Sequence, residues 1–243
     1  PIERRVFQTK KTCFPRTAER AKNAAIQALL VLNGVVMVYP LLVMLISAFK
    51  SNAEIFTSPF ALPAGFSLVN VARIWNETSF VLYLGNSAIV TTASVALILV
   101  FATMAAYAIA RYRFRLSGAV FLFFLCGLMV PLKLAIIPLF IQLDTLGLVD
   151  NRAGLVLVYT AMGLPSAVFI LTGFLRTLPG ELEEAARIEG ASELRIMLSV
   201  MLPLARPALV IAGIQNAVPI WNDFFFPLVL ITSDNLKTLP QGL

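Results

Sequence analysis

The chain has 243 residues, of which 59% are apolar and 13% are charged. A soluble domain is about half apolar and about a quarter charged, so this composition leaves too few polar residues to cover a water-soluble globule. It also excludes disorder, because disordered chains are poor in apolar residues. The sequence contains no histidine, and its two cysteines, Cys13 and Cys126, lie in a basic tail and an apolar run, so we predict no disulfide framework and no metal site. We therefore interpret the chain as an integral membrane protein.

Five stretches are long and apolar enough to cross a bilayer, which takes about 20 helical residues. These predicted spans are Ala25–Phe49, Val81–Ala110, Ser117–Ile141, Ala153–Leu175 and Pro207–Thr232. Barrel strands would alternate polar and apolar residues, and these stretches do not. A stripe of small residues on the second span, Ala102, Ala106 and Ala110, favours close helix packing. The sequence therefore predicts an all-α membrane protein, a polytopic helical bundle with residues 25–232 as its transmembrane domain.

The basic residues are concentrated on one side of these spans. Fourteen of the 19 Lys and Arg residues lie in the tail 1–24 and in the links 111–115 and 176–206. The positive-inside rule places this side, and with it the N-terminus, in the cytoplasm. The net charge of +6 is then a topology signal with a mild preference for anionic lipid. No aromatic cluster or motif accompanies the charge, so we expect no nucleic-acid partner.

The cytoplasmic link Arg176–Arg206 is the one long polar segment on that side. Several of its first residues suit the opening turn of a helix: Pro179, Glu181, Glu183 and Glu184. Gly190 stands where a left-handed cap would end this helix. Ser192 can then cap a second helix, Glu193–Met201, which Pro203 would end or kink. The pattern predicts a helix, a glycine turn and a second helix outside the membrane.

Two interpretations of this helix pair are open on physical grounds. The pair could rest on the lipid headgroups, although an acidic helix is repelled by an anionic leaflet. It could instead dock to another protein, because the small side chains of Ala185 and Ala186 let a partner backbone come close. The physical argument favours docking.

The link also carries a set of residues at fixed spacing: Glu184, Ala185 and Ala186, then Gly190, then Val200, Leu202 and Pro203. This spacing resembles the EAA signature of ABC importer permeases, with Val200 in place of Ile and Glu189 where the family usually has Asp. Other runs resemble carbohydrate-type permeases similar to the maltose inner subunit: Asn86-Ser87, Ala105–Ala108, Met129–Pro131, Ile137–Phe140, Leu146–Leu148, Trp221–Phe224 and Pro227-Leu228. The resemblance extends from about Ala25 to Leu243.

The resemblance implies an inner-membrane permease subunit of a binding-protein-dependent importer for a sugar or oligosaccharide. It implies that 177–203 forms a coupling helix seated in a separate ATPase, with these coupling residues: Glu184, Ala185, Ala186, Glu189, Gly190, Leu202 and Pro203. The sequence has no Gly-Lys pair and hence no P-loop, so ATP and Mg²⁺ are expected on the partner and not in this chain. A second permease subunit and an extracytoplasmic substrate-binding protein are the other implied partners. Such permeases have six spans, so we expect 233–243 to be an extracytoplasmic segment, ahead of a sixth span that this sequence lacks.

Charged groups inside spans are costly and usually face a cavity or a partner. Lys133 lies between Pro131 and Pro138, two prolines that are expected to make the third span irregular. In the fifth span, Asp223 follows Trp221 and Asn222, a combination of aromatic and polar groups that suits a sugar ring. We therefore predict that the substrate path includes Lys133, Trp221, Asn222 and Asp223. Alternatively, Asp223 pairs with Lys133 or with another subunit, and Trp221 is an interfacial anchor.

Three functional hypotheses follow. The favoured one is a sugar permease, and the second is a permease of the same superfamily for another solute. The third is a membrane scaffold or a secondary carrier, although no inverted repeat is apparent. No nucleophile–base pair is present, so we predict no catalytic residue and no enzymatic activity. The outer loop Lys50–Phe80 is apolar, and it is expected either to cap the bundle or to meet the binding protein.

Overall fold

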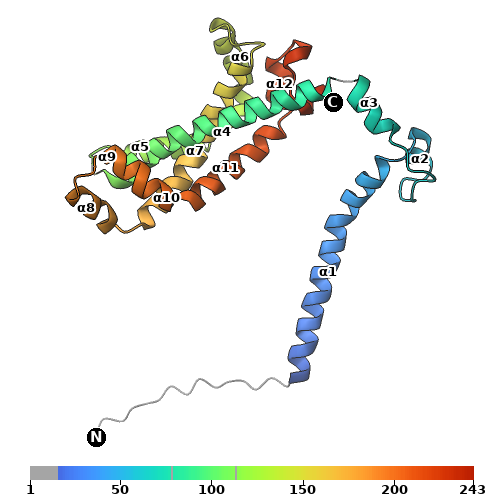
Figure 1. Cartoon of the computed structure of the whole chain (residues 1–243), viewed down its shortest axis with the longest axis horizontal. Helices are drawn as coiled ribbons and strands as arrows, with labels where there is room; N and C mark the ends of the chain where they lie inside the picture. The colour runs from blue at the N-terminus through green and yellow to red at the C-terminus, as the bar shows by residue number, and fades with distance from the viewer. Residues whose placement is uncertain (1–15, 78, 113) are drawn as a thin grey trace. The chain divides into compact units, whose positions relative to one another are not determined.

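The computed structural model in Figure 1 describes residues 16–77, 79–112 and 114–243, and the regular elements among them are all helical. The prediction of an all-α fold is therefore confirmed. The chain divides into two compact units, one ending at Glu77 and one beginning at Thr78. Most of the predicted basic tail, with Cys13, and Arg113 of the second link lie outside the described residues.

The first unit contains one long helix and two short ones: α1 (Arg16–Ser47), α2 (Asn52–Thr57) and α3 (Val69–Glu77). Within α1, Lys22–Ser47 is apolar enough to cross a membrane, and the rest of this unit buries none of its most apolar window. This helix contains most of the first predicted span. A capping box at Ser51 and Glu54 starts α2, since each side chain bonds the backbone of the other.

The second unit is built around two long apolar helices, α4 (Phe80–Arg111) and α7 (Arg152–Thr177), which pack against each other. Ala102 and Ala106 of α4 are fully buried in this contact, as the stripe of small residues predicts. A Cβ atom at Gly163 of α7 would collide with Ile98 and Asn216, so glycine is needed where three helices meet. Figure 1 shows α11 running beside these two helices.

The third predicted span is not one helix. It is divided into α5 (Ser117–Gly127), the 3-10 turn η1 (Leu132–Ala135) and α6 (Ile136–Thr145). The break precedes Pro131, which has no N–H to donate and disfavours helical geometry in the residue before it. Pro138 causes no further break in the helix. It lies in the first turn of α6, where a backbone N–H would have no acceptor within the helix, so the N–H that proline lacks is not missed. The irregularity predicted for the third span is therefore observed at Pro131, whereas Pro138 lies within a helix.

The fifth predicted span is also broken, into α11 (Arg206–Trp221) and α12 (Phe225–Leu230). Among the described residues, three helices are long and apolar enough to cross a membrane alone. The helices Glu193–Leu204 and Arg206–Trp221 would be a fourth candidate if they formed one broken span, but they are bent by 76°. Composition alone does not show where the chain leaves helical geometry within an apolar stretch.

The C-terminal segment, with η3 (Asp234–Leu236) and α13 (Leu239–Gly242), is tied to the start of α4. The buried Asn86 side chain donates to the carbonyl oxygens of Asn235 and Lys237, each at 2.9 Å. The Leu239 N–H donates to the Ser87 hydroxyl at 2.8 Å. Buried amides and hydroxyls need such partners, so Asn86 and Ser87 have a structural role in this segment.

Asp150 holds the preceding turn of the same segment. Its carboxylate accepts bonds from the Ser233 hydroxyl and from the N–H groups of Ser233 and Thr232, at 2.8 and 2.9 Å for the two amides. These hydrogen bonds lower the pKa of Asp150 from 3.8 to about 2, and the two bonds from Ser233 have the largest effect. A carboxylate with a lowered pKa stabilises the folded state at pH above its ordinary value, and that contribution is lost as the pH falls toward the lowered one.

We therefore expect hydrogen exchange in residues 232–243 to accelerate as the pH falls from about 4 to about 2, after correction for the intrinsic rate. Asp150→Ala should already exchange faster at neutral pH. Asp144→Ala, which removes an exposed carboxylate of α6, is the control and should match the unmodified chain. Equal exchange in all three proteins would contradict this account of the turn.

Candidate functional site

The link between α7 and α11 begins with α8 (Glu181–Ile188), which has three carboxylates in its first turn. Gly190 follows the C-cap of this helix, Glu189, and has a φ of +83°. The Gly190 N–H donates to Arg187 O and the Ala191 N–H to Ala186 O, both at 3.0 Å, which is the Schellman pattern. The predicted left-handed cap is confirmed.

The second helix of the link consists of α9 (Glu193–Ile196), the π-helical turn η2 (Met197–Met201) and α10 (Leu202–Leu204). The Ser192 hydroxyl accepts a bond from the Arg195 N–H, so the predicted cap is confirmed. Pro203 does not end the helix. In the π turn the Leu202 N–H donates to Met197 O, and the chain bends only at Ala205.

The outward face of α8 is formed by Glu181, Glu184, Ala185 and Ile188, which are all exposed. Their spacing places them on one side of a helix. Ile188 is 87% exposed, unusual for a large aliphatic side chain, and the motif alone does not mark it. Its helical spacing from Glu184 would have found it. Glu189 and Gly190 are also exposed, whereas Ala186 is half-buried against the core.

The inward face of α8 is held by an ion pair that the sequence analysis did not identify. Glu183 Oε1 lies 3.1 Å from Arg111 Nε, at the end of α4, and the two side chains are 7% and 10% exposed. The Arg111 guanidinium also donates to Leu178 O at 3.0 Å. These contacts attach the start of α8 to α4 and keep its outward face in place.

A second ion pair fastens α8 to α9 across the glycine turn. Arg187 donates to both carboxylate oxygens of Glu193, at 2.5 and 3.1 Å. These hydrogen bonds lower the pKa of Glu193 and raise the pKa of Arg187. The two helices of the link are therefore joined by both a backbone cap and a charged pair.

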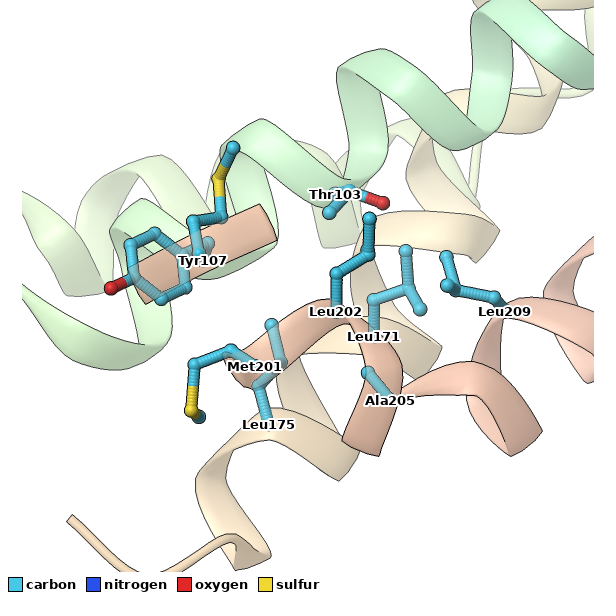
Figure 2. Close-up of a pocket in the computed structure, with 9 residues that line it drawn as sticks. Thr103, Tyr107, Leu171, Leu175, Met201, Leu202, Ala205 and Leu209 are labelled. Carbon is cyan, nitrogen blue, oxygen red and sulfur yellow. The ribbon is translucent and has the colours of Figure 1, made fainter. Parts of the chain in front are cut away.

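Figure 2 shows how the second helix meets the bundle. Met201 and Leu202 line an apolar pocket together with Tyr107 of α4 and Leu171 of α7. Leu202 is half-buried here, whereas Pro203 is exposed. Of the two predicted coupling residues in this helix, only Leu202 therefore faces the bundle. A displacement of the link would be passed to α4 and α7 through these apolar contacts.

Three of the other predicted site residues, Trp221, Asn222 and Asp223, lie where α11 and α12 are joined, and Lys133 lies in η1. Asp223 accepts a bond from the Tyr159 hydroxyl of α7 at 2.7 Å and from the Phe226 N–H at 3.1 Å. Asp223 thus caps the start of α12 and attaches the break between α11 and α12 to α7. Lys133 lies 5.6 Å from the centre of the Phe225 ring, a cation–π distance. The structure therefore brings the Lys133 break and the Asp223 break together.

The alternative pairing of Lys133 with Asp223 is not observed, since no ion pair among the described residues joins them. Asn222 is exposed, and its side-chain amide donates a hydrogen bond to Val218 O at 2.9 Å. Trp221 is half-buried. The predicted site residues thus form two groups. The first group is the link, which contacts Arg111, the last residue of α4. The second group includes Asp223, which contacts Tyr159 near the start of α7.

Comparisons with known proteins identify what this chain resembles. A family described as "Binding-protein-dependent transport system inner membrane component" matches residues 98–241. The diacetylchitobiose uptake permease of Streptomyces coelicolor is 39% identical over 227 residues, which cover 93% of this chain and 75% of that protein. The arabinooligosaccharide transport permease of Halalkalibacterium halodurans is 34% identical, covering 86% and 75%.

Among solved structures, a chain of a bacterial ABC transporter involved in the import of alginate superposes with a TM-score of 0.82. The match covers 99% of this chain and 80% of that one, at 24% sequence identity. At this identity the superposition bears on the fold alone, and it confirms the predicted permease bundle.

Proposed function

The chain belongs to the family of inner membrane components of binding-protein-dependent transport systems, and from this membership we propose that it is one of two permease subunits of an ATP-driven importer for a sugar or oligosaccharide. The relatives' names support the solute class, since they specify diacetylchitobiose and arabinooligosaccharides. An extracytoplasmic binding protein delivers the solute, and a second permease completes the path.

The outward face of α8 carries the proposal. It presents Glu184 as a polar anchor, Ala185 as a small contact that admits a partner backbone, and Ile188 as an apolar group 87% exposed. An exposed aliphatic side chain beside charged groups is typical of a protein interface. Because this chain has no P-loop, the partner on this face is the ATPase that binds ATP and Mg²⁺.

Coupling requires that a movement of the ATPase reaches the bundle without being absorbed on the way. Arg187 joins α8 to α9 through Glu193, and Glu183 attaches α8 to α4 through Arg111. Leu202 seats the second helix of the link against α4 and α7. ATP then shifts the equilibrium between the permease states only by its differential binding to them, transmitted through these contacts.

The solute path is proposed at the two helix breaks. Trp221, Asn222 and Lys133 provide an aromatic face, an amide and a cation, which suit the CH faces and hydroxyl edges of a sugar. Asp223, whose oxygens are occupied by Tyr159 and by the backbone of α12, shapes the break and is not a free sugar ligand.

Cysteine crosslinking tests the ATPase contact. In a background with Cys13 and Cys126 replaced by serine, Ala185→Cys should crosslink to the ATPase in intact vesicles, because position 185 is exposed. Asn222→Cys is the matched exposed control and should not. The assignment fails if Ala185→Cys never reaches a nucleotide-hydrolysing protein. Uptake of labelled oligosaccharides by the same vesicles tests the solute class separately.

A further inference from the structure

The segment Lys50–Glu77, here called the surface cap, connects two apolar helices. It begins three residues after the end of α1 and ends three residues before the start of α4. Both helices are long and apolar enough to cross a membrane. Because a residue spans at most about 3.6 Å, both ends of the cap must stay close to one bilayer surface. We propose that the cap lies in the phospholipid interface itself and inserts aromatic side chains into it.

A buried lysine folds the cap back onto α1. Lys50 is 1% exposed, and its Nζ donates to the carbonyl oxygens of Ser58 and Pro59 at 2.9 and 3.0 Å. The Asn70 amide donates to Ala48 O and Lys50 O, at 3.2 and 2.8 Å. These bonds direct the chain near residue 60 back along α1 toward its N-terminus.

The chain that folds back along α1 reaches the level of the hydrocarbon core of the membrane. The Phe60 ring stacks on Tyr39 with centroids 6.2 Å apart, and Tyr39 precedes the end of α1 by eight residues. Eight residues correspond to about 12 Å of helix. The apolar part of α1 has 26 residues. Such a helix exceeds a hydrocarbon core of about 30 Å by only about 9 Å, so Tyr39 lies at or below its edge. Phe60, which is 72% exposed in this unit, therefore meets lipid in our proposal.

The third helix of this unit supplies a second apolar face. Val71, Ile74 and Trp75 share one side of α3, and their side chains are 48%, 40% and 62% exposed. Arg73 and Asn76 lie on the opposite side. An amphipathic helix with tryptophan on its apolar face is the pattern of interfacial membrane helices. The other residues of this unit leave the apolar window of α1 uncovered too, so the cap and α1 share an apolar surface.

Tryptophan fluorescence of the full chain in proteoliposomes tests the proposal. Replacing Trp221 by phenylalanine leaves Trp75 as the single tryptophan. We expect blue-shifted emission that brominated phosphatidylcholine quenches strongly and that iodide, present on both sides, quenches weakly. The Trp75 side chain should lie about 5–10 Å deep, at the boundary between headgroups and acyl chains. A Phe60→Trp chain without the two native tryptophans should be quenched by lipid as well.

The matched control is Asn76→Trp in a Trp75→Phe, Trp221→Phe chain, which moves the fluorophore by one residue to the polar side of α3. It should emit at longer wavelength and be quenched by iodide. Equal iodide quenching at positions 75 and 76, without lipid quenching, would overturn the proposal. Protection of Trp75 that appears only when a substrate-binding protein is added would also overturn it, in favour of a protein-docking surface. Neither result depends on ATPase coupling.

Discussion

Replacing Gly190 by proline is expected to abolish transport while the ATPase continues to hydrolyse ATP and the permease remains in the membrane. Gly190 has a φ of +83°, whereas proline fixes φ at about −65°. Proline also lacks the N–H that donates to Arg187 O. The turn between α8 and α9 would therefore open, and the ATPase would move a link that no longer transmits the movement.

Uptake and ATP hydrolysis measured in the same proteoliposomes, with immunoblots of the membranes, check this expectation. Two alanine substitutions at glycines make this test more specific. Gly190→Ala should cost about 1–2 kcal/mol because of its positive φ and should reduce coupling partly. Gly180→Ala, at the other end of α8, has a φ of −68° and open space around its Cβ, so it should be silent. Normal transport by Gly190→Pro would count against the coupling assignment.

Replacing Glu183 by alanine is expected to destabilise the protein by about 3 kcal/mol, as removal of one partner leaves a largely buried charge unpaired. The remaining Arg111 is only 10% exposed in its side chain, although it keeps its bond to Leu178 O. The start of α8 would separate from α4, so transport should fall together with stability.

Thermal unfolding in detergent measures this loss, and a neighbouring carboxylate is the control. Glu184→Ala removes an exposed group, so its stability should change by less than about 0.5 kcal/mol, while attachment of the ATPase weakens. In a double-mutant cycle, replacing Arg111 and Glu183 together by methionine and leucine should recover part of the stability. Equal melting temperatures for Glu183→Ala and the unmodified chain would refute the structural role of this ion pair.

Local features of the link could be predicted because their causes lie within a few residues. The Gly190 cap depends on the backbone freedom of one residue, and the Ser192 cap on a bond to an N–H three residues later. The apolar lengths of α1, α4 and α7 likewise predict helices in a bilayer. Cause and effect are adjacent in the chain in each case.

Predictions failed where the outcome depends on distant segments. The prolines indicated an irregular third span, but nothing local indicated the break at Asp223, because composition does not show that Tyr159 provides a hydroxyl for the Asp223 carboxylate, 64 residues away. Such a break needs a partner for its freed polar groups, and only the folded bundle supplies one.

The sequence by itself determined the membrane class, the helical architecture and the family, since hydropathy, turn chemistry and motif spacing are local properties. The tertiary structure alone decided which carboxylate faces outward: Glu184 is exposed, while Glu183 beside it meets Arg111, 72 residues earlier in the chain. Two adjacent helical residues point about 100° apart, and which of them is buried depends on the helix that packs against them.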